Sequence, residues 1–202
     1  MLALACGSSG PAEPSPAAGP PPVVVVLGDS LTAGPGLRPE ETYPALLQQK
    51  AAAAGYRHRI VNAGVSGDTT ADALRRLDRA FERDATILVV ALGANDGLRH
   101  VPVEEVRANL REILRRARSQ GLKILLAGME TPPHHGWQYT LDFHRLFPDL
   151  ASEFDVPLMP FLLAGVVGNQ SMNLPDGVHP NAAGMRAIAN AMWPYLEPLL
   201  RE

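Results

Sequence analysis

Short apolar runs alternate with longer amphipathic stretches along most of the chain. The run at 23–27 contains four consecutive valines, and branched side chains in an unbroken run are typical of a strand covered on both faces. Similar apolar runs predict further strands at 59–62, 86–92, 123–127 and 156–159. Between the runs, apolar residues recur every three to four positions, which predicts helices over 43–54, 70–81, 103–120, 141–154 and 181–200. These repeated strand–helix units predict an α/β fold, with a parallel sheet between two layers of helices.

The first 21 residues have a different character. Residues 7–21 consist of Pro, Gly, Ser and Ala apart from one Glu, so they predict a flexible linker that cannot bury apolar area. We therefore expect a folded domain at 22–202. The residues before Cys6 resemble the lipid-attachment site of a bacterial lipoprotein, but only five of them precede the cysteine. Either Cys6 anchors a periplasmic or membrane-tethered protein whose true start is longer, or it is an ordinary residue of a soluble protein.

Composition narrows the class of protein. A chain of 202 residues with 46% hydrophobic and 19% charged residues is typical of one globular domain. The net charge of −3 gives no reason to expect a nucleic-acid partner. For the oligomeric state we favour a monomer. No apolar run reaches the roughly 18 residues that a transmembrane helix needs. The single cysteine excludes an internal disulfide and a cysteine-based metal cluster.

Polar and glycine-rich loops follow the predicted strands. They read GDSLTAG at 28–34, NAGVSGDTT at 62–70, LGANDG at 92–97 and, before the last helix, DGVHPN at 176–181. Each alone is also compatible with an ordinary turn. In open parallel sheets, however, ligands bind at the carboxyl ends of the strands, where these loops would converge. Their joint occurrence therefore favours one site.

The residues of these loops suit nucleophilic catalysis. A serine hydroxyl is a weak nucleophile until an imidazole takes its proton, so Ser30 is the candidate nucleophile and His179 the candidate base. Asp176 lies close enough in sequence to orient the His179 ring. Attack on an acyl carbon creates an oxyanion, for which we predict three donors: the backbone N–H groups of Ser30 and Gly67 and the side-chain amide of Asn95.

These four blocks, in this order, resemble those of the GDSL or SGNH hydrolases, whose name-giving residues would here be Ser30, Gly67, Asn95 and His179. The segment EFDVPLMPFLLAGV at 153–166 looks most like the bacterial arylesterase, acyl-CoA thioesterase and lysophospholipase branch. The resemblance implies a three-layer, flavodoxin-like fold with about five parallel strands. It also implies Ser-Asp-His catalysis without a metal or organic cofactor. The G-x-S-x-G elbow of the larger α/β-hydrolases is absent from the sequence.

Other polar residues receive more local interpretations. Asp29 is expected to hold the turn before the nucleophile by accepting backbone N–H groups. The loop METPPHHGWQY at 129–139 offers apolar area for the wall of a substrate pocket. The predicted pocket residues are Asp29, Leu31, Thr131, Pro132, His134, Trp137 and Val178. His58, His100 and His144 are expected at the surface, and the adjacent histidines at 134 and 135 have no obvious carboxylate partner for a metal site.

We therefore predict a serine hydrolase that cleaves aryl or short-to-medium acyl esters through an acyl-enzyme, and also thioesters or lysophospholipids. Its partner would be a small-molecule or lipid acyl ester. An esterase that removes acetyl groups from carbohydrates is the alternative within the same chemistry. A binding module that retains the fold without catalysis is the alternative from another class, and the intact Ser30, Asp176 and His179 argue against it.

Overall fold

A parallel β-sheet forms the centre of the molecule in the computed structural model, which describes residues 19–81 and 85–201. Cys6 and most of the expected linker lie outside these residues. Within them the sheet has five strands, in the order β2-β1-β3-β4-β5, and all neighbours pair in parallel. The strands are β1 (Val23–Gly28), β2 (Arg59–Gly64), β3 (Ala85–Ala91), β4 (Lys123–Ala127) and β5 (Leu158–Met159).

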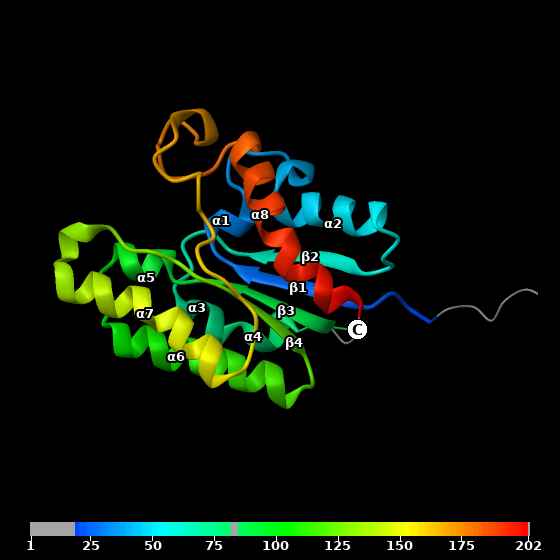
Figure 1. Cartoon of the computed structure of the whole chain (residues 1–202), viewed down its shortest axis with the longest axis horizontal. Coiled ribbons are helices and arrows are strands. Elements are labelled where there is room, and N and C mark those ends of the chain that lie inside the picture. Colours follow the sequence, from blue (N-terminus) through cyan, green and yellow to red (C-terminus); the bar gives the residue numbers. More distant parts are fainter. Residues whose placement is uncertain (1–18, 82–84, 202) are drawn as a thin grey trace, which may run out of the picture.

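Helices cover both faces of this sheet (Figure 1). The helices α2 and α8 pack together on one face, where α2 also contacts β2, and α3, α4, α6 and α7 cover the other. The three-layer α/β architecture is therefore confirmed. The helices are α1 (Ser30–Ala33), α2 (Tyr43–Ala53), α3 (Thr70–Arg75), α4 (Leu77–Ala80), α5 (Ala94–Leu98), α6 (Val103–Ser119), α7 (Trp137–Glu153) and α8 (Ala182–Arg201), with 3-10 turns at Pro39–Glu41, Pro133–His135 and Gln170–Met172.

The valine run forms β1, which pairs with β2 on one side and β3 on the other. All six of its residues are buried, as expected for a strand with helices on both of its faces. Because parallel strands end at the same edge, the loops that follow β1 to β5 share one rim. None of the helices within the described ranges is long and apolar enough to cross a membrane.

Three predicted elements differ from the structure. The helix expected over 70–81 is interrupted at Arg76, which has φ −102° and ψ 7° and separates α3 from α4. The helix expected from 141 begins at Trp137, directly after Gly136 at φ +92°. The last strand covers only Leu158–Met159, because Pro157 has no N–H to donate to the ladder.

Candidate active site

Ser30 is the first residue of α1, directly after the buried strand β1. Asp29 caps this helix, because its Oδ1 accepts the backbone N–H of Leu31 at 2.9 Å, as predicted for a turn-holding role. The end of β2 lies close to α1: a Cβ added at Gly64 would stand 2.4 Å from the backbone nitrogen of Ala33. A glycine at this position therefore allows the close approach that fixes the backbone around Ser30.

The loop before α8 carries the other two candidate residues. The carboxylate of Asp176 accepts the backbone N–H groups of Val178 and His179 through Oδ1, at 2.9 and 3.0 Å. Its Oδ2 lies 2.7 Å from His179 Nδ1. The loop is closed at its base, where the N–H of Leu174 donates to the His179 carbonyl at 2.7 Å. Asp176 and His179 thus form a rigid local unit.

His179 connects this unit to the start of α1. His179 Nε2 lies 3.0 Å from Ser30 Oγ, although the two residues are 149 positions apart in the chain. The hydrogen bonds from His179 and Val178 hold the pKa of the Asp176 carboxyl down at about 2, so it is ionised over the physiological range. An ionised carboxylate at Nδ1 favours the tautomer whose proton sits on Nδ1 and leaves Nε2 free to accept the Ser30 hydroxyl proton.

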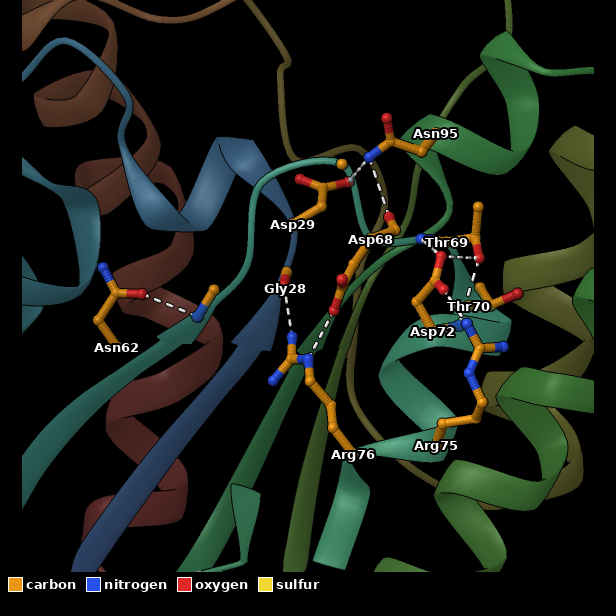
Figure 2. A network of polar contacts seen from close by, with 12 residues as sticks. Gly28, Asp29, Asn62, Asp68, Thr69, Thr70, Asp72, Arg75, Arg76 and Asn95 are labelled. Atoms are coloured by element: carbon orange, nitrogen blue, oxygen red, sulfur yellow. Dashed lines mark hydrogen bonds and ion pairs between the residues drawn. The ribbon is translucent and has the colours of Figure 1, made fainter. Parts of the chain in front are cut away.

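Two further predicted residues lie on the neighbouring loops. Asn95, in α5, donates through Nδ2 to the carbonyl of Asp68 at 2.9 Å and lies 3.4 Å from Asp29 Oδ2 (Figure 2). Gly67 has φ +86°, a left-handed backbone conformation that favours glycine. Its carbonyl accepts a hydrogen bond of 2.9 Å from the guanidinium of Arg99. Both loops are therefore held in defined conformations beside the start of α1.

A network behind these loops was missed by the sequence reasoning (Figure 2). The guanidinium of Arg76 donates to Asp68 Oδ2 at 2.5 Å and to the carbonyl of Gly28 at 3.0 Å. It therefore ties the Gly67 loop to the end of β1, two residues before the candidate nucleophile. In the sequence, Arg76 resembles one of several surface arginines on an amphipathic helix. Only the acidic residue in the GDTT block hinted that an arginine would be needed nearby.

Buried carboxylates are a second feature of the site. Asp29 has no exposed surface, and its burial raises the pKa of the carboxyl to about 6. Asp96, in α5, is also buried and accepts the Thr70 hydroxyl at 2.6 Å and the Thr70 N–H at 2.9 Å. Burial raises the pKa of this carboxyl as well. The Asp96–Thr70 contact joins α5, which carries Asn95, to the start of α3.

The residues predicted to line a substrate pocket differ in how exposed they are to solvent. Leu31 and Thr131 are buried, and the Thr131 hydroxyl donates to the carbonyl of Gly97 at 3.2 Å. Pro132 is half-buried, whereas His134, Trp137 and Val178 are exposed. A cavity of about 420 Å³ lies beside the loop that carries Asp176, and its lining residues are Gly168, Gln170, Asn173, Leu174, Pro175 and Gly177. This cavity adjoins Asp176 through Gly177, and none of the predicted pocket residues lines it.

The remaining histidines lie outside this constellation. His100 and His135 stack with ring centroids 4.4 Å apart, and His144 Nδ1 lies 2.7 Å from Glu130. His58 is on a different loop, before β2. Within the described part of the chain, no group of three or more His, Cys, Asp or Glu side chains is arranged to hold a metal ion.

Comparisons with known proteins identify the relatives of this chain. Residues 26–187 match the model of the GDSL-like lipase/acylhydrolase family. The chain is 40% identical to the esterase TesA of Pseudomonas aeruginosa over 178 residues, which cover 88% of this chain and 89% of that protein. It is 35% identical to thioesterase 1/protease 1/lysophospholipase L1 of Escherichia coli K12 over 178 residues, 88% of this chain and 84% of that protein.

A solved structure supports the same relationship. The crystal structure of AlinE4, an esterase of the SGNH-hydrolase family, superposes with a TM-score of 0.74 at 37% identity. The match covers 90% of this chain and 98% of AlinE4. The resemblance that the four sequence blocks indicated is confirmed.

Proposed function

The chain belongs to the GDSL-like lipase/acylhydrolase family and is a serine hydrolase of ester bonds, and we propose that Ser30, His179 and Asp176 form its catalytic triad. The observation that carries this proposal is the continuous chain of contacts from Asp176 Oδ2 through the imidazole to Ser30 Oγ, at 2.7 and 3.0 Å. Both distances allow hydrogen bonds, so a proton can move from the hydroxyl to the ring without rearrangement.

In the proposed reaction, Ser30 Oγ attacks the acyl carbon while its proton passes to His179 Nε2. The carbonyl oxygen becomes an oxyanion, which would accept hydrogen bonds from the N–H groups of Ser30 and Gly67 and from Asn95 Nδ2. When the intermediate collapses, the alcohol or thiol leaves and takes the proton from Nε2. A water molecule then transfers a proton to Nε2 and hydrolyses the acyl-enzyme, which restores the Ser30 hydroxyl.

We further propose that the substrates are carboxylic esters with lipophilic acyl groups, including aryl esters, thioesters and lysophospholipids. Relatives with these activities in their names support this range. The exposed apolar side chain of Val178, which directly precedes His179 in the chain, supports it too. A pocket for a sugar would instead need several polar side chains that are free to bind hydroxyl groups.

The test compares Ser30→Ala with the wild type on p-nitrophenyl esters from acetate to dodecanoate. We expect Ser30→Ala to remove turnover at every chain length while circular dichroism stays unchanged. Ser152→Ala, at an exposed position on α7, is the matched control and should retain full activity. Retention of a tenth of the wild-type turnover in Ser30→Ala would contradict the assignment of the nucleophile.

A labelling experiment tests the same assignment without substrate turnover. A serine-directed fluorophosphonate should attach to the peptide that contains Ser30, and the label should be absent in Ser30→Ala. A label that maps to a different serine would refute the proposal. The chain-length series then decides between lipophilic acyl esters and the acetyl-esterase alternative, which predicts activity restricted to the acetate.

The cellular location is a proposal that rests on residues outside the described ranges. We propose that Cys6 carries a lipid and that residues 7–21 tether the hydrolase to a membrane. Growth with an alkyne-bearing fatty acid should label the full-length protein, and Cys6→Ser should remove the label. An unlabelled wild-type protein would make Cys6 an ordinary residue.

We also propose that the protein is a monomer. Its sedimentation should therefore correspond to the mass of one chain.

A further inference from the structure

The large hydrophobic side chains that are exposed share one edge of the molecule. Within the described residues they are Val65, Leu98, Trp137, Val167 and Val178, with exposed fractions between 44% and 78%. Each lies on a segment that leaves the carboxyl edge of the sheet, after β2, β3, β4 or β5. In Figure 1 this is the side where α5, the start of α7 and the orange segment before α8 project beyond the strands. We call these five residues the apolar rim.

Single exposed hydrophobic residues are normal on a protein surface, but their confinement to one edge is not. The other faces carry many charges, such as the ion pairs of Arg111 with Glu153 and of Arg115 with Glu112. Helix α8 likewise presents a charged side chain, Arg186, at an exposed position. The apolar rim therefore marks a surface of distinct chemistry rather than the average composition of the protein.

Formal charges are scarce in the sequence on either side of the apolar-rim residues. Within two positions of its members, the acidic residues are Asp96, which is buried against Thr70, and Asp176, which is bonded to His179. The basic residue is Arg99, whose guanidinium donates to the carbonyl of Gly67. The chain neighbours are otherwise glycines, histidines and neutral residues. Such a surface suits an apolar, electrically neutral partner.

The apolar rim is continuous with the catalytic machinery. Val178 lies beside His179 in the loop before α8, and Leu98 ends the same short helix that carries Asn95. The most exposed member is Trp137, at 78%, and an indole combines a large apolar body with a polar N–H. Because of this amphipathic character, tryptophan is enriched where membrane proteins meet the headgroup region of a lipid layer.

We propose that the apolar rim docks on the surface of a zwitterionic lipid aggregate, so that the enzyme takes its acyl ester from that surface. This inference rests on the proposed function, because a lipid surface supplies lipophilic esters to the same site. A zwitterionic surface is favoured over an anionic one because the rim lacks the cluster of lysines and arginines that anionic lipids attract. Docking would place the entrance of the site against the lipid.

The two tryptophans of the chain provide a direct test. Trp193→Phe leaves Trp137 as the sole indole, in the apolar rim. Trp137→Phe leaves Trp193, which lies in the second half of α8. The ring centroids of Trp193 and Tyr56 are 6.3 Å apart. With phosphatidylcholine vesicles, the emission of Trp137 should shift to shorter wavelength, and brominated acyl chains should quench it. The emission of Trp193 should change in neither respect.

A second variant tests the role in catalysis. Leu98→Ser with Val167→Ser removes apolar area from two rim positions that are not in the proposed triad or oxyanion hole. We expect binding to phosphatidylcholine vesicles to weaken by about ten-fold or more, because the variant loses apolar area that the lipid would bury. Hydrolysis of micellar lysophosphatidylcholine should fall in step, while hydrolysis of monomeric p-nitrophenyl acetate stays within about two-fold of the wild type.

The binding arm is repeated in Ser30→Ala, which separates this inference from the proposed function. Vesicle binding by Ser30→Ala supports docking even if the triad assignment fails. The inference is overturned if vesicles leave Trp137 emission unchanged. It is also overturned if only a monomeric ester shifts the emission, which would make the rim a pocket wall, or if the protein self-associates through Trp137 without lipid. Binding restricted to phosphatidylglycerol vesicles would reject the zwitterionic partner.

Discussion

Replacement of Asp29 by asparagine should stabilise the protein at alkaline pH and have a smaller effect at acidic pH. Burial disfavours the charged carboxylate and raises the pKa of Asp29 from 3.8 to about 6. The folded state therefore keeps this proton over a range in which the unfolded chain has lost it, so stability falls as the pH rises from about 4 to above 6. The full penalty corresponds to about 3 kcal/mol, of which about 2 kcal/mol develops between pH 4.5 and 8.

The side-chain amide that Asp29→Asn introduces can still accept the N–H of Leu31, but it cannot also accept from Asn95, which lies 3.4 Å from Asp29 Oδ2 in the wild type. That lost contact costs the same at every pH, so it cancels when the mutational effect at pH 4.5 is subtracted from the effect at pH 8. Urea titrations followed by circular dichroism give both free energies of unfolding. The expected difference is about 2 kcal/mol in favour of the variant at pH 8.

Asp176→Asn is the matched control because the pKa of Asp176 is shifted in the opposite direction, to about 2, by hydrogen bonds to the carboxylate. The Asp176 carboxylate therefore stabilises the folded state at pH values above its ordinary pKa of 3.8, and this stabilisation is lost as the pH falls toward 2. Its replacement should therefore bring no gain in stability between pH 4.5 and 8. An Asp29→Asn effect that is equal at the two pH values would refute the reasoning about burial.

Three other substitutions probe the same region. Asn95→Ala should lower kcat by roughly 10²–10³-fold, as expected for the loss of one oxyanion donor, while the Kd of a non-reacting substrate analogue changes little. An equal loss in turnover and in binding would make Asn95 an ordinary substrate contact. Gly64→Ala should lower the Tm, because its Cβ would meet the backbone nitrogen of Ala33 at 2.4 Å; an unchanged Tm would contradict this packing. Thr69→Ala removes the cap that Thr69 and Asp72 form at the start of α3, so the free energy of unfolding in urea should fall by about 1 kcal/mol. Thr69→Ser should restore both the cap and the stability.

The strands and the main helices could be predicted in their order along the chain because hydrophobic periodicity is a local signal. The valine run, for example, forms a strand that is buried along its whole length, as expected. The short helices α1 and α5 were not predicted. They span four and five residues, too few for a periodic pattern, and their sequences contain the polar residues typical of turns.

The site could be predicted only in part, because its residues come from loops whose convergence depends on the sheet. Three polar blocks after strands and one before the last helix indicated Ser30, Gly67, Asn95 and His179 as candidates. The contact of Arg76 with Gly28, 48 positions away, leaves no pattern in the sequence. The burial of Thr131 likewise depends on packing against Gly97, which periodicity within one segment cannot report.

In the proposed triad, the closed loop that holds Asp176 and His179 makes the activity of the enzyme a sensitive measure of its own folding. Asp176 and the proposed base are fixed to each other within four residues, so the alignment with Ser30 depends on how α8, which follows this loop, packs against α2 and the sheet. A loosening of α8 would separate the base from the nucleophile while most helices and strands remain intact. Loss of turnover should therefore precede the loss of ellipticity during gradual denaturation, and the interval between them measures how firmly the carboxyl-terminal helix is held.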